Sequence, residues 1–366
     1  MENKLKIGIA HGDINGIGYE LIIKMMTDNK LCEVCTPVLY GSSKVAAYYR
    51  KMLNVENFNL NSVQTAKEAN PKRCNVVNCI DDEVKVEPGQ ETPESDEAAM
   101  LALNTALEAL DSGEIAAVVA APVGIRAFRL QKAEGCTEFL SNRYDARQAT
   151  PLLVGNHLKV GFMTMHLPLH EVASRISLNS VLTKIKILDH TLRKDFTIRK
   201  PRIAVLGLNP RTGGQEQGET EKEALVPAIA KARENGILAF GPYHADTFFT
   251  GMDYQKFDVV LAMYHDQGMI PFKSLEGNEG AVLITGLPVV YTSSVSGTAF
   301  DIAGQGTGDE TGLRNALYLA IDVYATRKQN AALSSNPLQH YNVEGNTNES
   351  DLNVDQIAGI RHQSED

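Results

Sequence analysis

The sequence predicts an α/β protein in which helices cover both faces of mixed sheets. Short apolar runs alternate with amphipathic segments along most of the 366 residues, and no internal repeat is present. One apolar run, 259–263, has the length of a buried strand and changes within one residue to Tyr264, His265 and Asp266. Polar residues at the end of a buried strand face the ligand-binding crevice of an α/β sheet, so this stretch predicts where the functional site lies.

The N-terminal third predicts strands and helices in alternation. We expect strands at 4–10, 36–41 and 115–121, and helices at 17–27 and 94–112. The glycine-rich turn at 11–18 either aims backbone N–H groups at an anion or is a tight structural turn. The helix at 94–112 is expected to bury one face made of four residues: Ala98, Leu101, Thr105 and Ala109. Residues 135–138 are expected in a polar connection.

The remaining two thirds continue the alternation and end in a polar segment. We expect a hairpin from 151–155 and 160–165, further strands at 202–206, 259–263, 281–285 and 288–291, and helices at 179–194, 219–234 and 313–324. Asn235 and Gly236 are typical of a helix C-cap. A polar turn is expected at 241–246 and a glycine-bearing loop at 298–306. Beyond about residue 334 the composition predicts a disordered tail.

Composition excludes several classes of protein. A formal net charge of −10 argues against sequence-independent binding to nucleic acid, which needs a basic face. No apolar run is long enough to span a membrane, and no apolar signal segment precedes the first strand, so a cytoplasmic protein is expected. Five cysteines are too few and odd in number for a disulfide framework, and we interpret the isolated pair Cys32 and Cys35 as core thiols.

Eight segments together resemble one enzyme family. They are GDINGIGYE, GCTEFL, HLPLHEV, LGLNP, GPYHADTFF, VLAMYHDQGMIPFK, TGLPVVYTS and GTAFDIAGQG, and they run in family order over residues 5–327. This series is similar to that of the 4-hydroxythreonine-4-phosphate dehydrogenases of pyridoxal 5'-phosphate biosynthesis. Joint occurrence in order is far more specific than any single short motif.

The resemblance implies a fold, an assembly and a reaction. It implies the two-domain fold of isocitrate and isopropylmalate dehydrogenases, with residues 1–128 and about 286–332 in one domain, about 129–285 in the other, and a tail at 333–366. It further implies a homodimer whose shared active site lies in the cleft between the domains. The implied reaction is NAD-dependent oxidation of a small phosphorylated hydroxy acid, 4-phosphooxy-L-threonine, followed by loss of carbon dioxide.

The resemblance also assigns roles to individual residues. His166 and His265 match ligands of a divalent metal (zinc, magnesium or cobalt), which polarises the substrate alcohol. Thr137 matches a substrate contact, and Lys273 matches a cation that holds the anionic groups of the substrate. Asp246, Asp266 and Lys273 are the further catalytic candidates. The loop that wraps the adenosine half of NAD is matched by Gly297, Thr298, Asp301, Ala303 and Gly304.

The sequence departs from the family pattern inside the site. Arg211 stands where the family has a third histidine ligand, and Cys136, Val282 and Tyr291 replace a histidine, an asparagine and an arginine that contact substrate. An arginine keeps its proton and offers no lone pair to a metal. Three readings therefore stay open: the family enzyme, a metal-independent dehydrogenase for another hydroxy acid in which Arg211 stabilises the oxyanion, and a non-catalytic paralogue that keeps the dimeric scaffold.

Overall fold

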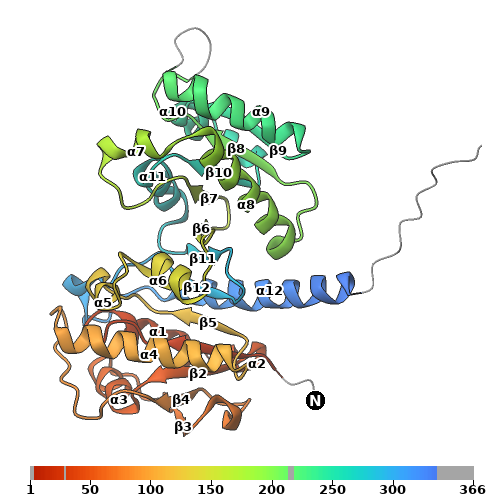
Figure 1. Cartoon of the computed structure of the whole chain (residues 1–366). Helices are drawn as coiled ribbons and strands as arrows, with labels where there is room; N and C mark the ends of the chain where they lie inside the picture. The colour runs from red at the N-terminus through yellow and green to blue at the C-terminus, as the bar shows by residue number, and fades with distance from the viewer. Residues whose placement is uncertain (1–3, 29, 213–217, 336–366) are drawn as a thin grey trace, which may run out of the picture. The chain divides into compact units, whose positions relative to one another are not determined.

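The computed structural model describes residues 4–28, 30–212 and 218–335 (Figure 1). The described residues up to Asn330 form one compact unit. In the described residues a mixed sheet of twelve strands has the order β3-β4-β2-β1-β5-β12-β11-β6-β7-β10-β8-β9. The pairs β12–β11, β11–β6 and β6–β7 are antiparallel, and the other pairs are parallel. The predicted α/β class with a mixed sheet is confirmed.

The strands and helices have the following bounds. The strands are β1 Lys6–Ala10, β2 Thr36–Gly41, β3 Asn61–Val63, β4 Asn75–Asn78, β5 Ala117–Ala120, β6 Thr150–Val154, β7 Lys159–Phe162, β8 Arg202–Leu206, β9 Leu238–Tyr243, β10 Val259–Ala262, β11 Ala281–Thr285 and β12 Tyr291–Ser294. The α-helices are α1 Gly18–Thr27, α2 Leu31–Val34, α3 Ser43–Met52, α4 Pro93–Asp111, α5 Ile125–Leu130, α6 Cys136–Arg143, α7 Leu169–Arg175, α8 Leu178–Phe196, α9 Val226–Glu234, α10 Ala245–Thr250, α11 His265–Glu276 and α12 Thr311–Ser334.

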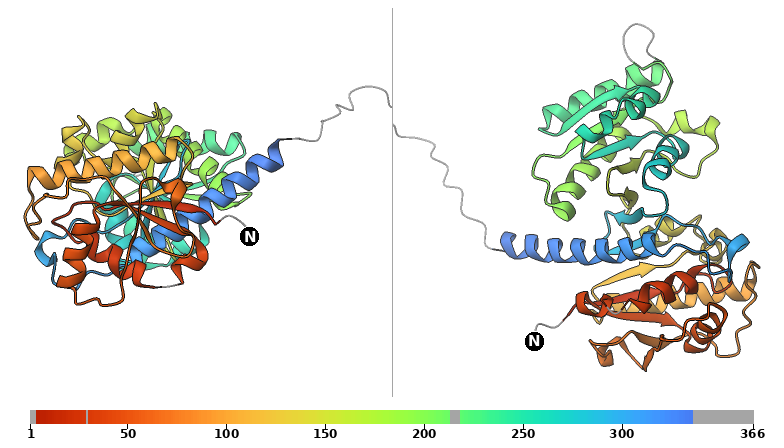
Figure 2. Two further views of the ribbon diagram at one scale, coloured as in Figure 1. Left: turned by 90° about the horizontal axis from the view of Figure 1, so that it is seen from below. Right: turned by 180° about the vertical axis from the view of Figure 1, so that it is seen from behind.

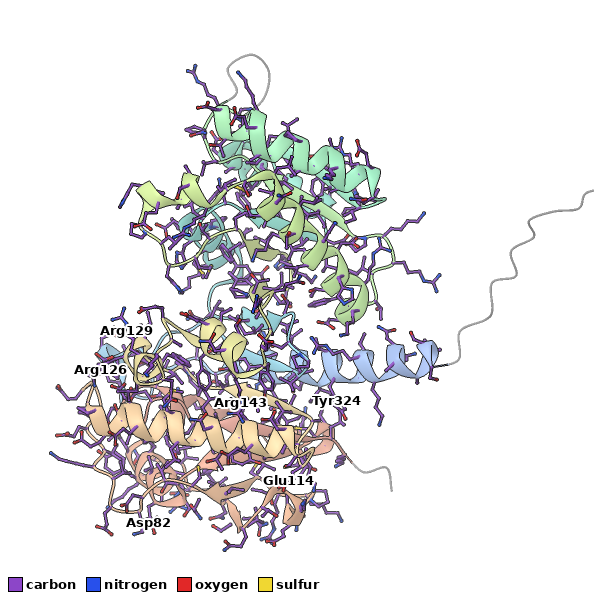
Figure 3. All side chains as sticks on the ribbon, viewed as in Figure 1. Asp82, Glu114, Arg126, Arg129, Arg143 and Tyr324 are labelled. Atoms are coloured by element: carbon purple, nitrogen blue, oxygen red, sulfur yellow. The ribbon has the colours of Figure 1, made fainter. Side chains whose placement is uncertain are left out.

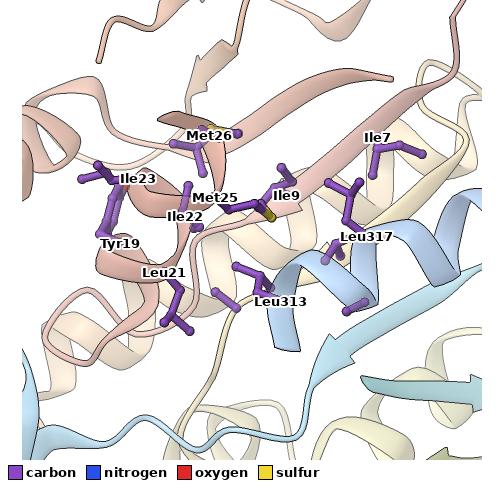
Figure 4. Packing of buried hydrophobic residues seen from close by; sticks show 14 of the residues in the cluster. Ile7, Ile9, Tyr19, Leu21, Ile22, Ile23, Met25, Met26, Leu313 and Leu317 are labelled. Atoms are coloured by element: carbon purple, nitrogen blue, oxygen red, sulfur yellow. The ribbon is translucent and has the colours of Figure 1, made fainter. Parts of the chain in front are cut away.

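The part of the sheet around β1 and β5 is covered by helices on both faces. Ile7 and Ile9 pack with α1 and α12 in one core, where Figure 4 shows Leu313 and Leu317 beside them. Val118 of β5 belongs to the opposite core, together with α4 side chains. Figure 2 (left) shows α4 and α12 on opposite sides of these strands. Alternate strand residues thus serve two apolar layers, as expected for a buried parallel strand.

The part of the sheet around β10 is built in the same way. Val259 and Leu261 pack in one core with residues of α8 and α9, and Val260 packs in another with Phe272 of α11 and Phe248 of α10. A strand that is apolar on both faces has only its ends available for polar chemistry. The polar residues after β10 therefore lie at the carboxyl end of a buried strand.

Several predicted boundaries were wrong. The 135–138 segment is not a polar connection, because α6 begins at Cys136, and residues 241–243 belong to β9 instead of a turn. The last strand is β12 at Tyr291–Ser294 and not 288–291, because its pairing with β5 aligns Tyr291 with Val118. Leu101 of α4 is 49% exposed, since the bulkier stripe of Leu103 and Leu107 faces the sheet.

Two expectations concern the end of the chain and its domains. The final helix extends to Ser334, ten residues beyond the predicted end, so residues 333 and 334 are helical. The rest of the predicted tail, 336–366, lies outside the described residues. The division into two domains stays a prediction.

All five cysteines are free thiols, and Cys35 is buried in the core as expected.

Candidate active site

Four parallel strands bring the predicted catalytic segments to one edge of the sheet. In the order β7-β10-β8-β9 the strands run parallel, so their carboxyl ends meet at the same edge. His166 follows β7, His265 follows β10, Arg211 follows β8 and Asp246 follows β9. Residues separated by up to 99 positions in the sequence are therefore neighbours along one edge.

The two predicted metal-ligating histidines lie next to each other. The ring centroids of His166 and His265 are 5.8 Å apart. His265 Nδ1 lies 2.7 Å from Asp266 Oδ1, and the ring of Phe162 stacks on that of His265 with their centroids 6.4 Å apart. Partial burial, with a smaller effect from the nearby His265, lowers the pKa of His166. The carboxylate fixes the tautomer of His265 with a proton on Nδ1, so its Nε2 lone pair can accept another proton.

Polar contacts fix the ends of β7, β10 and β8 with respect to one another. The Thr164 hydroxyl donates to the Met263 carbonyl at 2.8 Å, which holds the segment before His166 against β10. The side chain of Gln267 accepts from Met263 N at 2.7 Å and donates to the Gly207 carbonyl at 2.7 Å. The start of α11, which carries His265, is thereby tied to both neighbouring strands.

The loop that carries Arg211 is also held by buried side chains. The Glu221 carboxylate is completely buried and accepts from Asn209 N at 2.8 Å and from Asn209 Nδ2 at 2.9 Å. His244 Nδ1 lies 2.8 Å from the Pro210 carbonyl oxygen. Glu221 and His244 were not predicted as site residues. A single carboxylate or histidine gives no sequence signal for which loop it will hold.

The donor set does not fit the predicted metal. Among the residues that the structure describes, no three His, Cys, Asp or Glu side chains lie close enough to hold a metal ion. A catalytic zinc site normally takes three protein ligands. The carboxylate of Asp266 already faces His265, and Arg211 offers no lone pair. His166 and His265 alone would thus be an incomplete site.

A cavity of about 480 Å³ lies beside His166. Thr137, Cys136 and Val282 line it together with His166, so the predicted substrate contact Thr137 shares a cavity with one histidine. Lys273 on α11 and Asp246 on α10 are exposed and do not line this cavity, and neither His265 nor Asp266 is among its lining residues.

The predicted nucleotide loop, residues 297–304, is fixed against the start of α1. Ile17 N donates to the Thr298 carbonyl at 3.0 Å, and a Cβ on Gly16 would lie only 2.7 Å from that carbonyl oxygen. Gly304 has φ +78°, a conformation that favours glycine. Gly297 is exposed, with open space around its Cα, and Asp301 is exposed. An ordered loop with accessible backbone and one carboxylate fits the adenosine half of NAD.

Glu20 and Lys24 of α1 fasten the end of this loop. The buried Glu20 carboxylate accepts from Gly308 N at 2.6 Å and from Gly306 N at 3.3 Å, and Lys24 Nζ lies 2.9 Å from Glu20 Oε1. Lys24 Nζ also donates to the Gly306 carbonyl at 2.8 Å. This clamp has no local sequence pattern, because the two segments are more than 280 residues apart.

Replacing Glu20 with glutamine is expected to loosen the nucleotide loop. The change removes a charged acceptor and the ion pair with Lys24, so we expect the free energy of unfolding to fall by about 2 kcal/mol. The rise in melting temperature on addition of NAD should also become smaller. Calorimetry with and without NAD measures both effects. Glu33→Gln on the exposed part of α2 is the matched control, and equal behaviour of the two variants would contradict a role for the clamp.

Asp13 is a buried carboxyl beside the same α1 turn. It accepts from Asn15 N at 2.8 Å and from the Ser95 hydroxyl at 3.3 Å, and burial raises its pKa to about 6. A raised carboxyl pKa means that the folded protein retains a proton that the unfolded chain loses, so stability falls as the pH rises from about 3.8 to about 6. Burial lowers the pKa of the neighbouring His11 to about 4, which has the opposite effect on stability over nearly the same pH range.

An Asp13→Asn variant is expected to separate these two effects. The variant lacks the titrating carboxyl. Its free energy of unfolding minus that of the wild type should therefore increase by about 2–3 kcal/mol between pH 4 and pH 7. Urea unfolding of both proteins at the two pH values measures the difference. A difference that does not change with pH would show that Asp13 ionises normally in the folded protein.

Comparisons with known proteins agree with this architecture. Residues 33–320 match the family model described as pyridoxal phosphate biosynthetic protein PdxA. The chain is 43% identical over 361 residues to a 4-hydroxythreonine-4-phosphate dehydrogenase from Bacteroides thetaiotaomicron, covering 97% of this chain and 99% of the relative. Relatives with this name are enzymes of pyridoxal phosphate biosynthesis.

Solved structures give the same result. The crystal structure of 4-hydroxythreonine-4-phosphate dehydrogenase from Klebsiella pneumoniae superposes with a TM-score of 0.76 at 30% identity, covering 88% of this chain and 98% of that one. A terephthalate 1,2-cis-dihydrodiol dehydrogenase from Burkholderia xenovorans superposes with a TM-score of 0.57 at 27% identity, covering 87% and 98%. The resemblance inferred from the sequence motifs is confirmed: this chain belongs to the family of the pyridoxal phosphate biosynthetic protein PdxA.

Proposed function

We propose that this protein catalyses the NAD-dependent oxidation of the secondary alcohol of a small hydroxy acid, with His265 as the proton acceptor. The names of its relatives make 4-phosphooxy-L-threonine the first substrate to test. The proposal depends above all on two contacts of His265: its Nδ1 lies 2.7 Å from Asp266 Oδ1, and its ring centroid lies 5.8 Å from that of His166. An imidazole oriented by a carboxylate is a common general base.

The proposed chemistry divides between the cofactor and the protein. NAD, held by loop 297–304, supplies the acceptor for the hydride that leaves the substrate carbon. The hydroxyl proton passes to His265 Nε2 while the Nδ1 proton stays hydrogen-bonded to Asp266, which stabilises the imidazolium that forms. Both electrons of the C–H bond leave with the hydride, and the C–O bond becomes a carbonyl.

Two cations, Arg211 at this sheet edge and Lys273 further along α11, would serve the substrate carboxylate and any later loss of carbon dioxide. Lys273 lies eight residues after His265 on α11, so it is about two turns further along the same helix. Arg211, at the end of β8, would stabilise negative charge that develops on the substrate oxygen. No metal is assigned to the reaction, because His166 and His265 lack a third protein ligand among the described residues.

An Arg211→His variant is expected to create the missing metal site. The change removes a permanent charge that repels a divalent cation and adds a third imidazole at the edge shared by β7, β10 and β8. The variant should bind close to one zinc ion per chain, whereas the wild type should hold much less than one. Elemental analysis after dialysis against zinc measures this. An Arg175→His variant, which adds a histidine on exposed α7, is the control for zinc bound by any additional surface histidine. One zinc ion per chain in the wild type would contradict the conclusion that His166 and His265 form an incomplete metal site.

NADH formation tests the proposed function. The purified protein is incubated with NAD and either 4-phosphooxy-L-threonine, its unphosphorylated counterpart, or a cyclic cis-dihydrodiol acid of the kind named for the Burkholderia relative. We expect NADH from at least one of these alcohols and a rise in melting temperature with NAD alone. If NAD neither raises the melting temperature nor is reduced with any alcohol, a non-catalytic role on the family scaffold is supported instead.

A homodimer and a cytoplasmic location belong to the same proposal. Both are supported by the membership of the PdxA family and by the resemblance to its enzymes. No helix within the described ranges of the chain combines the length and apolar character that crossing a membrane requires. Sedimentation of the purified protein gives its assembly state directly.

A further inference from the structure

We infer that Cys32 and Cys74 form a reversible disulfide when the protein meets a small disulfide that carries carboxylate groups. Cys32 lies in α2, and Cys74 comes directly before β4, so 42 positions of sequence separate two cysteines that are neighbours in the fold. Neither cysteine lines the cavity beside His166. The inference therefore does not depend on the proposed function.

The sulfur atoms of the two cysteines lie close together. Cys32 Sγ is 3.9 Å from Cys74 Sγ, whereas the sulfur atoms of a disulfide are about 2.05 Å apart. Bond formation thus brings them about 2 Å closer, a shift that rotation of a cysteine side chain about its Cα–Cβ bond can supply. Cys32 belongs to a helix of only four residues, so its side chain can turn without disturbing a long helix.

Cys35, the nearest cysteine to Cys32 in the sequence, lies in a different environment. Its side chain is completely buried, and its Sγ donates to the Leu31 carbonyl at 3.8 Å, back toward the preceding turn. Burial raises the pKa of the Cys35 thiol to about 12, so this thiol stays protonated at neutral pH. The spacing of Cys32 and Cys35 in the sequence therefore does not identify the reactive pair, which the fold forms from Cys32 and Cys74.

A cavity of about 340 Å³ gives a small reagent access to the pair, because both Cys32 and Cys74 line it. Cys32 is partly exposed, whereas Cys74 is only 9% exposed. Burial, with a smaller effect from the Cys32 thiol, raises the pKa of Cys74 well above its usual value. Since the thiolate is the nucleophile in disulfide exchange, Cys32 is expected to attack first and Cys74 second.

The charges around the cavity favour a reagent with carboxylate groups. Besides the two cysteines, its polar lining consists of two cations and three amides: Lys72, Arg73, Asn57, Asn59 and Asn61. No Asp or Glu is among the described residues that line it, and Asp82 and Glu114, which Figure 3 labels, lie outside this lining. The cations attract carboxylates, and the amides can hydrogen-bond to them.

The bond forms in two exchange steps. The Cys32 thiolate attacks one sulfur of the small disulfide, whose S–S bond breaks, and one small thiolate leaves. The Cys74 thiol then gives up its proton and attacks Cys32 Sγ, so the mixed disulfide breaks and the second small thiolate leaves. The two protein thiols lose two electrons and two protons in total, and the small disulfide takes up both and is released as two thiols.

Peptide mapping tests the pair directly. The reduced full-length protein is treated with oxidised glutathione and digested without a reductant, and the peptides are identified by mass spectrometry. We expect a cross-linked peptide that contains Cys32 and Cys74 and that dithiothreitol separates. Cys32→Ser and Cys74→Ser should lack this peptide, and Cys35→Ser should keep it.

Two results of the mapping would overturn the inference. One is a cross-link between Cys32 and Cys35, and the other is glutathione bound to Cys32 with no cross-link in the wild type. The wild-type map alone distinguishes these results, so the conclusion does not depend on the folding of a variant at the buried Cys35.

The stability of the oxidised protein shows whether the native fold accommodates the bond. A cross-link between residues 42 positions apart restricts the unfolded chain, so the melting temperature of the oxidised wild type should exceed that of the reduced protein by about 3–6 °C. Cys32→Ser, treated in the same way, is the control and should show no rise. A lower melting temperature after oxidation would contradict a disulfide that fits the native fold.

A double variant tests the role of the two cations. In Lys72→Gln/Arg73→Gln, cross-linking by oxidised glutathione should be about threefold slower or more than in the wild type, because the attraction for carboxylates is lost. Cross-linking by the uncharged 2-hydroxyethyl disulfide should keep its rate and is the control. Equal rates with oxidised glutathione in the two proteins would overturn the preference for a carboxylate-bearing reagent.

Discussion

A Glu276→Ala variant is expected to lose about 3–5 kcal/mol of the free energy of unfolding. Glu276 lies at the end of α11 and is only 5% exposed. Its carboxylate accepts hydrogen bonds from three consecutive backbone N–H groups of the β6–β7 turn: Asn156 N at 2.9 Å, His157 N at 2.7 Å and Leu158 N at 2.9 Å. Alanine would leave these donors without an acceptor, and each buried, unsatisfied group costs about 1–3 kcal/mol.

The Glu276→Ala change should also loosen the segments that carry the proposed active-site histidines. Glu276 joins the hairpin that leads to His166 with the helix that begins at His265, so it holds the two elements that carry the imidazoles. Urea unfolding measures the stability. Glu279→Ala is the matched control, because the Glu279 carboxylate accepts an exposed hydrogen bond from Asn156 Nδ2 at 3.2 Å, and its loss should cost less than about 0.5 kcal/mol. Equal stability of the two variants would contradict the role of Glu276.

Replacing His265 with glutamine is expected to lower kcat by a factor of about 10²–10⁴, the contribution typical of a general base. An Asp266→Asn variant should lose a similar amount, because an amide can donate to Nδ1 and so favour the wrong tautomer. The KM for the hydroxy acid should change little, since neither residue is proposed to bind the substrate in the ground state.

Initial rates of NADH formation measure both variants. His170→Gln is the control, because His170 is exposed on α7 and pairs only weakly with Glu171 at 3.7 Å. A rate in His265→Gln within threefold of the control would remove His265 from the reaction. A loss confined to KM would reassign it to substrate binding.

The sequence predicted the alternating strands and helices because their patterns depend on near neighbours. Strand β8 has the predicted bounds, and the apolar run at β10 is buried on both faces. The prediction was poorer where tertiary pairing decides the boundary. β12 is displaced because its partner β5 sets the register at Tyr291, and the buried face of α4 follows the larger side chains Leu103 and Leu107.

The candidate site was predicted only in part for a similar physical reason. The change from apolar to polar residues at the end of a strand led to His265, and the resemblance to the family led to His166 and Thr137. The groups that hold the segments around the site, such as Glu221 for the Arg211 loop and Glu276 and Gln267 for α11, act across 12 to 120 positions of sequence. Such hydrogen bonds depend on the completed fold and leave no local pattern.

Residues of this chain, together with NAD, are proposed to carry out proton and hydride transfer at the edge shared by β7 and β10. The most direct measurement is the initial rate of NADH formation by the wild type after treatment with a metal chelator, compared with the untreated enzyme and with His265→Gln. We expect an unchanged rate after chelation and a loss of at least a hundredfold in the variant. A rate that chelation abolishes and added zinc, magnesium or cobalt restores would contradict this expectation.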